Sequence, residues 1–206
     1  MANNPTNYSP NLPRVSSIVE FVHPFIWESK DRFHSWLTKN NISLADYMEE
    51  ASTGWTYVHK AMEDLGDGKP FRWKKYKDIV NSWIQFHNDY NPTKNKSEVY
   101  IKCKEYQWTL DRLCEINWEK WLLDWKSYWL AKEKFNLPNN YKKPYDKLKK
   151  ARLQLSLYNR ALKYKYKLAV VELTPSGYYF HVLEQLPKEE LEELIFLYKN
   201  NYIDQL

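Results

Sequence analysis

The sequence predicts an α/β protein in which a central mixed β-sheet is flanked by helices. The hydrophobic pattern has helical spacing before residue 91 and changes to alternation over residues 97–104 and 108–116. The predicted elements then follow as three strands, a helix, two strands and a final helix. The chain has 206 residues, with neither an internal repeat nor a composition shift that would divide it. We therefore expect a single domain over residues 1–206.

The first part of the chain is predicted to be helical. Residues 1–13 carry three prolines and no periodicity, so we expect a loose arm there. Short helices are expected over 16–21 and 28–37. Ser43 is placed to cap a long helix, with Asp46 as a weaker capping-box partner. That helix is expected to end at the sequence Gly66-Asp67-Gly68, and a further amphipathic helix is expected over 73–90, closed by Asn91-Pro92.

The second part carries the predicted strands. Alternating apolar residues predict two strands over 97–104 and 108–116, and a third strand over 120–125 follows after a short turn. A basic amphipathic helix is predicted over 145–162. Two further strands, over 167–173 and 178–183, flank a turn with the sequence Thr174-Pro175-Ser176-Gly177. Pro187 opens the last helix, whose early glutamates suit the positive helix end.

Composition excludes several classes of protein. Only four glycines are present, which disfavours glycine-rich nucleotide-binding loops. The two cysteines exclude a disulfide framework and a four-cysteine metal site. No apolar run approaches the ~18 residues of a membrane span, and no secretory signal is visible, so we expect a cytoplasmic protein. The net charge of +5 permits an anionic partner, and aromatics at 17% suit either a ring-rich core or base stacking.

Two aspartates and a lysine lie on consecutive predicted strands. Asp111 is on the second strand, and Asp124 and Lys126 are on the third, two residues apart and so on one face. The residues before Asp124 are apolar, and a charge at the end of a buried strand is costly unless it is paired or metal-bound. A salt bridge between Asp124 and Lys126 explains the same residues.

Other polar residues are candidates for the same region. Glu98 lies on the preceding predicted strand. It could bind a second metal ion, support a metal ligand without contacting the ion, or be an ordinary exposed strand residue. His59 lies in the middle of the helix that begins after Ser43, where a structural role is the alternative. Gln154 and Tyr158 are four residues apart on one face of the basic helix, a spacing that also arises by chance.

Together these residues resemble the PD-(D/E)xK nuclease superfamily, in its RecB-like, phage-exonuclease-like branch. The resemblance runs in order from about residue 12 to about residue 202. Residues 12–18 resemble the opening helix, and residues 54–59 resemble the glycine-to-histidine motif. The first acidic position of the family is matched by Asp111, and its second acid with the following lysine by Asp124-x-Lys126. Its glutamine–tyrosine motif is matched by Gln154-x-x-x-Tyr158.

The resemblance implies a restriction-endonuclease-like core and a metal-dependent DNA nuclease. It implies one or two Mg²⁺ or Mn²⁺ ions, without an iron–sulfur cluster, held by His59, Asp111, Asp124 and the backbone carbonyl of Trp125. The implied catalytic residues are Asp111, Asp124, Lys126, Gln154 and Tyr158. The basic residues that we expect to contact DNA are Lys147, Lys150, Arg152 and Arg160.

The expected substrate is DNA, as a single strand or a duplex end. The expected role is an exonuclease or structure-specific nuclease in replication, recombination or phage DNA processing. It would act in the cytoplasm of a bacterium or of a phage-infected host, with a recombination or replication protein as a possible partner. One alternative is a catalytically inactive nucleic-acid-binding or assembly protein on the same fold. Another is an interaction protein in which the singled-out side chains do not meet.

Overall fold

A single mixed β-sheet forms the centre of the protein. The computed structural model describes residues 9, 12–23, 34–69, 76–127 and 145–203. The five strands lie in sequence order. Strands β1 to β3 form an antiparallel meander, β4 is parallel to β3, and β5 returns antiparallel to β4. The strands are β1 (Thr93–Lys102), β2 (Gln107–Ile116), β3 (Glu119–Lys126), β4 (Lys167–Thr174) and β5 (Gly177–Leu183).

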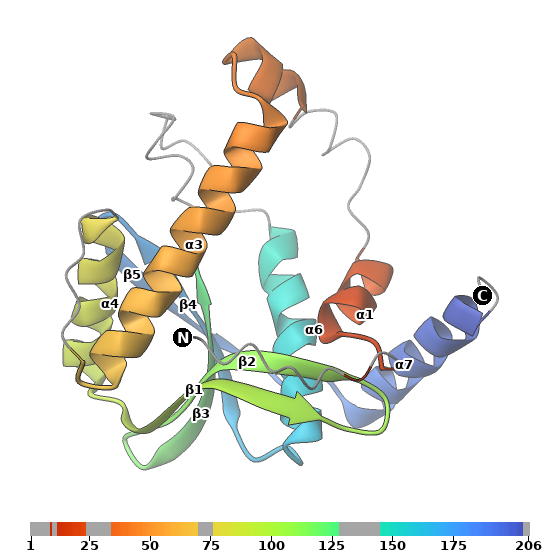
Figure 1. The fold of residues 1–206 in the computed structure, drawn as a ribbon. Helices are drawn as coiled ribbons and strands as arrows, with labels where there is room; N and C mark the ends of the chain where they lie inside the picture. The colour runs from red at the N-terminus through yellow and green to blue at the C-terminus, as the bar shows by residue number, and fades with distance from the viewer. Residues whose placement is uncertain (1–8, 10–11, 24–33, 70–75, 128–144, 204–206) are drawn as a thin grey trace.

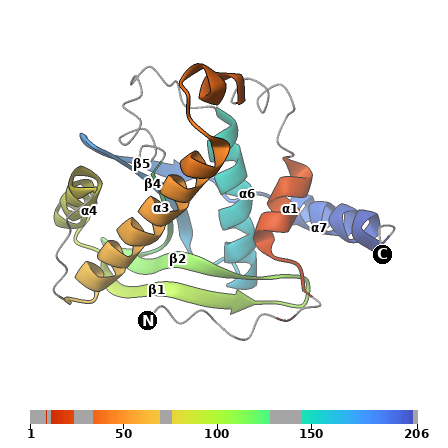
Figure 2. The same cartoon turned by 45° about the horizontal axis from the view of Figure 1, so that its top comes forward.

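Helices cover both faces of the sheet (Figures 1 and 2). One group lies over the face that carries Leu122 and Val170. The other lies over the face that carries Leu123 and Val171. The first group consists of α1 (Val15–Val22), α6 (Tyr145–Ala161) and α7 (Lys188–Ile203), and the second of α3 (Leu44–Gly66) and α4 (Lys77–Tyr90).

This alternation follows from the β-strand itself. Successive side chains of a strand point to opposite faces, so an apolar strand supplies two cores at once. In β3, Leu122 joins the core under α6, whereas Trp121, Leu123 and Trp125 join the core under α3 and α4. Both cores are therefore anchored on the same central strand.

The predicted fold class is confirmed: the protein is α/β, with a mixed sheet between helices, consistent with a restriction-endonuclease-like core. The long helix starts as predicted, because Ser43 Oγ accepts a hydrogen bond from the Asp46 amide at 3.0 Å. Strand β1 begins four residues earlier than predicted, at Thr93. A register shift between Thr93 and Lys96 disturbs the alternation there, which is why the sequence pattern missed it.

The described part of the predicted loose arm is tied to the sheet. The Gln107 side chain donates hydrogen bonds to the carbonyls of Ser9 and Leu12 and accepts one from the Ser9 amide. The backbone amide of Gln107 also donates a hydrogen bond to the Pro13 carbonyl. These residues are therefore not loose, because one buried glutamine satisfies their backbone groups. The remainder of residues 1–13, and the part of the helix predicted over 28–37 that precedes residue 34, lie outside the described residues.

One further prediction falls partly outside the described ranges. The helix predicted over 73–90 is described from α4 at Lys77, and Tyr76 precedes it with a left-handed backbone at φ 52°. In the part of the chain that the structure describes, no helix combines the length and apolar character needed to cross a membrane.

Candidate functional site

The two predicted aspartates stand where strands β2 and β3 separate. Paired residues run from Ile116 and Glu119 to Arg112 and Leu123, so Asp111 and Asp124 occupy the next position of the register. There the Asp111 carboxylate accepts a hydrogen bond from the Trp125 amide at 2.9 Å. The Asp111 side chain thus satisfies the Trp125 backbone amide, which lies beyond the last backbone pair of β2 and β3. This bond fixes the Asp111 carboxylate beside Asp124.

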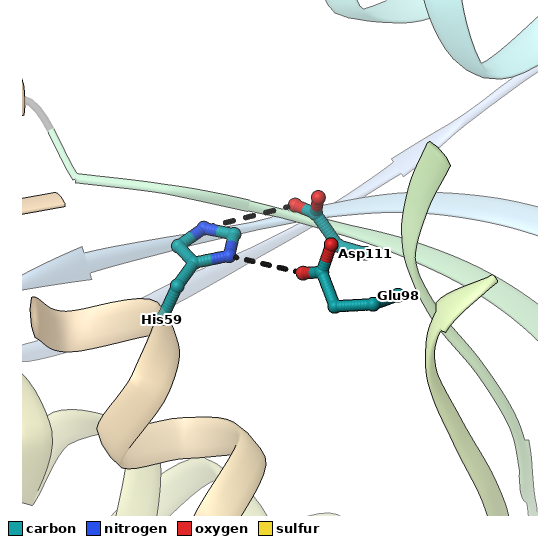
Figure 3. Close-up of side chains that lie close together, drawn as sticks. All are labelled: His59, Glu98 and Asp111. Carbon is teal, nitrogen blue, oxygen red and sulfur yellow. Dashed lines mark ion pairs between the residues drawn. The ribbon is translucent and has the colours of Figure 1, made fainter. Parts of the chain in front are cut away.

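His59 and Glu98 complete a cluster with Asp111 (Figure 3). The histidine extends from α3, Glu98 from β1 and Asp111 from β2. Glu98 Oε1 lies 3.6 Å from His59 Nδ1, and Asp111 Oδ2 lies 4.0 Å from His59 Nε2. One ligand atom from each residue lies within 4.8 Å of the others. Residues from three separate elements therefore converge on a volume the size of an ion site.

Local packing holds α3 and its histidine in place. Gly54, one turn and a half before His59, lies against the Tyr76 ring, and a Cβ on it would come within 2.9 Å of that ring. The Tyr76 hydroxyl donates to the Glu50 carboxylate. The Trp55 ring lies edge-on to the imidazole of His59, with centroids 4.0 Å apart. The glycine of the predicted motif therefore allows Tyr76 to approach α3, and Trp55 limits the imidazole's rotation.

Asp124 and Lys126 form the predicted pair beside this cluster. Lys126 Nζ lies 2.6 Å from Asp124 Oδ2, and the Asp124 side chain is 3% exposed. Burial raises the pKa of Asp124 to about 6; Lys126 opposes the shift and the nearby Asp111 adds to it. This influence of Asp111, and an opposing one from His59, show that Asp124 is their electrostatic neighbour. The salt bridge that the sequence also allowed is present, and it lies next to the cluster.

Gln154 and Tyr158 interact with each other on α6. Gln154 Nε2 donates to the Tyr158 hydroxyl at 2.7 Å, and Tyr158 is buried in the same core as Leu122 and Val170. Leu122 lies two residues before Asp124, and Val170 is the β4 partner of Asp124. Because residues two apart on a strand share a face, Asp124 points toward the side of the sheet that α6 covers. The structure thus places the glutamine–tyrosine pair over the face of the sheet that carries Asp124.

A second buried acid near Lys126 was missed by the sequence analysis. Glu172 on β4 is the register partner of Lys126, is 3% exposed, and lies 3.3 Å from His181 on β5. Its position inside an apolar strand is a signal of the same kind that identified Asp124. The parallel pairing of β3 with β4, which makes Glu172 a neighbour of Lys126, has no local sequence signature.

The four basic residues predicted to contact DNA have different surroundings on α6. Arg160 is ion-paired with Glu105 at 3.2 Å, and Arg152 Nε donates to the Glu184 carbonyl at 2.8 Å. Lys150 is half-buried, and the Lys147 side chain lies outside the described residues. The guanidinium of Arg160 therefore serves a contact within the protein. DNA binding by all four residues stays a prediction.

The cluster fits a divalent cation. His59 Nε2 is buried, has no hydrogen-bond partner and lies near Asp111 Oδ2. Ligand bonds of about 2.1 Å separate two donors on one ion by about 3 to 4.2 Å, and the observed 4.0 Å falls in that range. Carboxylate oxygens with one imidazole suit Mn²⁺ and tolerate Mg²⁺. The backbone carbonyl of Trp125, whose amide bonds Asp111, stays a prediction as a ligand.

Comparisons with known proteins add a similarity of fold alone. No family model matches the chain. No curated protein matches it. One solved structure that it resembles is the crystal structure of SSO0001, at 14% sequence identity and a TM-score of 0.48, covering 97% of this chain and 79% of that chain. A similarity of this degree does not establish a shared function.

Proposed function

We propose that this protein is a metal-dependent phosphodiesterase that hydrolyses DNA, as an exonuclease or a structure-specific nuclease. The observation that carries the proposal is the approach of His59 Nε2, buried and without a hydrogen-bond partner, to Asp111 Oδ2 where β2 and β3 separate. A buried donor or acceptor without a partner is costly, and a divalent cation between these two atoms removes that cost.

The arrangement of charges supports the same proposal. Asp124 is buried next to Asp111, and this burial and repulsion disfavour its ionised form. Both carboxylates offer the oxygen donors that Mg²⁺ and Mn²⁺ prefer. Such an ion supplies charge neutralisation at a phosphate and lowers the pKa of water. His59, Asp111 and Asp124 would hold it.

The remaining residues have roles that follow from their positions. Lys126 is a quarter exposed and carries its ammonium group 2.6 Å from Asp124. It is therefore placed to stabilise negative charge on a phosphate or to orient an attacking water molecule. Gln154 lies over the face of the sheet that carries Asp124, and half-buried there it would position substrate, while buried Tyr158 holds its side chain by a hydrogen bond. The net charge of +5 favours an anionic polymer as the substrate.

The decisive experiment is cleavage of end-labelled single-stranded and duplex DNA by the pure protein. Reactions contain Mg²⁺, Mn²⁺ or EDTA, and labels on the 5′ and 3′ ends report polarity. We expect cleavage with either metal and none in EDTA. DNA binding without cleavage in any metal would instead support the inactive nucleic-acid-binding alternative. The absence of both would overturn the proposal.

A further inference from the structure

The imidazole of His59 faces a different carboxylate on each of its nitrogens (Figure 3). Nδ1 is 3.6 Å from Glu98 Oε1, and Nε2 is 4.0 Å from Asp111 Oδ2. A neutral imidazole carries one proton, so one nitrogen donates a hydrogen bond and the other presents a lone pair. The nitrogen that holds the proton decides which carboxylate shares a cation with the histidine.

We propose that Glu98 is a positioning residue that keeps the proton on Nδ1 of His59. The lone pair of Nε2 is then directed to the side of Asp111. This inference rests on the proposed function for the ion at Nε2, and it assigns Glu98 a place behind the ligand. Metal-binding histidines commonly donate their second ring N–H to a carboxylate in this way, which fixes the orientation of the ring.

Burial favours this division of roles over direct ligation by Glu98. The side chain of Glu98 is 46% exposed, whereas those of His59 and Asp111 are 18% and 19% exposed. The more hydrated carboxylate is therefore at the outer edge of the cluster. On the other side of the ring, Nε2 is buried without a hydrogen-bond partner. That atom has the greater need for a cation.

The backbone at Glu98 has an unusual conformation for a β-strand. Glu98 has φ 49°, a left-handed value that is unfavourable for a residue with a Cβ. Lys94, which also has a positive φ in β1, lies at a register shift, whereas the register on both sides of Glu98 is continuous. The strand therefore adopts this conformation without an insertion, a kind of strain that tends to occur at functional sites.

The pairing of β1 with β2 explains why the contact needs the histidine. Ser97 pairs with Arg112 and Val99 with Leu110, so Glu98 stands opposite Asp111. Like charges directly opposite on neighbouring strands are destabilising. An imidazole with its Nδ1 proton toward Glu98 and a cation beside Asp111 offsets the repulsion at both acids.

The tautomer of His59 tests the inference without any metal. Nitrogen NMR of the isotope-labelled full chain is recorded at alkaline pH, where imidazole is neutral, and His59→Asn assigns the signal among the five histidines. We expect the Nδ1–H form in the wild type. Glu98→Gln should keep it, because an amide oxygen also accepts the bond, and Glu98→Ala should lose it. An Nε2–H form in the wild type would overturn the assignment, and this reading needs no Glu98 variant to fold.

Titration with Mn²⁺ alone, followed by electron paramagnetic resonance, supplies the second measurement. We expect the affinity to fall about 10- to 100-fold in Glu98→Ala and less in Glu98→Gln. Equal losses in both variants would indicate that the charge of Glu98 is required directly, and would overturn the positioning role. Glu115→Gln, which removes a β2 carboxylate paired with Lys94, is the matched control and should bind as the wild type does.

The two measurements separate this inference from the proposed function. An Nδ1–H tautomer together with absent Mn²⁺ binding would overturn the proposed function and support the placement of the proton by Glu98. Mn²⁺ binding together with an Nε2–H tautomer would do the reverse.

Discussion

The backbone amide of Trp125 donates its hydrogen bond to the side chain of Asp111, at 2.9 Å. The Asp111 carboxylate therefore has two roles. It links β2 to β3 where their backbone pairing ends, and it lies beside His59. A substitution that separates the two roles shows whether Asp111 is structural, functional or both.

Asp111→Asn and Asp111→Ala form that pair of variants. The amide oxygen of asparagine still accepts the Trp125 bond, so the free energy of unfolding should stay near that of the wild type while Mn²⁺ binding is lost. Asp111→Ala also leaves the Trp125 amide without its partner and should be less stable by about 1–3 kcal/mol. Chemical denaturation and Mn²⁺ titration measure the two effects. Undiminished Mn²⁺ binding by Asp111→Asn would contradict the assigned ligand.

Mn²⁺ should stabilise the wild-type protein and not His59→Ala. A ligand that binds only the folded state adds about 2.7 kcal/mol at a hundred times its dissociation constant. Thermal unfolding with Mn²⁺ and with EDTA measures the difference, and Glu115→Gln is the control that should keep the full shift. An equal shift in His59→Ala would return the histidine to a structural role.

Lys126→Met should lower the rate of DNA cleavage about 10²- to 10³-fold, the range for loss of one group that stabilises charge in the transition state. Asp124→Ala should abolish cleavage. Circular dichroism checks that both variants are folded, because the ion pair between Asp124 and Lys126, at 2.6 Å, also contributes to the fold. A folded Asp124→Ala protein that cleaves DNA at the wild-type rate would refute the site.

Arg160 and Lys150 should respond differently in DNA binding. Arg160 is paired with Glu105, so Arg160→Gln should lower the unfolding free energy by about 1–3 kcal/mol and leave the salt dependence of binding unchanged. Lys150→Gln should reduce the slope of log affinity against log salt by about 0.9 for duplex DNA. Fluorescence anisotropy over a salt series measures both slopes. A reduced slope for Arg160→Gln would show that this guanidinium reaches phosphate.

The thiol of Cys114 should be inert and should make stability fall at high pH. Burial raises its pKa from 9.0 to about 12. The folded protein therefore keeps this proton where the unfolded chain releases it, so the unfolding free energy should decrease as the pH rises above about 9. In Cys114→Ala this decrease should be smaller. Alkylation of the native protein should reach half-buried Cys103 first, and faster labelling of Cys114 would contradict the burial.

The sequence predicted the elements and the acids for local reasons. Alternation of side chains placed Asp124 and Lys126 on one face, and the Ser43 cap fixed the start of α3. What it could not supply is long-range: Glu98 opposite Asp111 depends on the pairing of β1 with β2, and Glu172 beside Lys126 depends on the parallel pairing of β3 with β4. Neither strand pairing can be predicted from the residues next to Glu98 or Glu172 in the sequence.

The same limit applies to Arg160 and Gln107. The basic helix face led us to expect that Arg160 contacts DNA, and it gave no sign that Glu105, more than fifty residues earlier, forms an ion pair with it. Residues 1–13 show no periodicity, yet Gln107 holds the described ones by three side-chain hydrogen bonds. Hydrophobic periodicity carries no record of such polar contacts between distant residues.

His59 comes from a helix that packs on one face of the sheet, while both aspartates belong to the strands. A chain that has formed its sheet but has not yet docked α3 has Asp111 and Asp124 in place without the imidazole of His59. It therefore lacks the complete ion site. Under the proposed nuclease function, cleavage of DNA would therefore require that α3 has docked on the sheet.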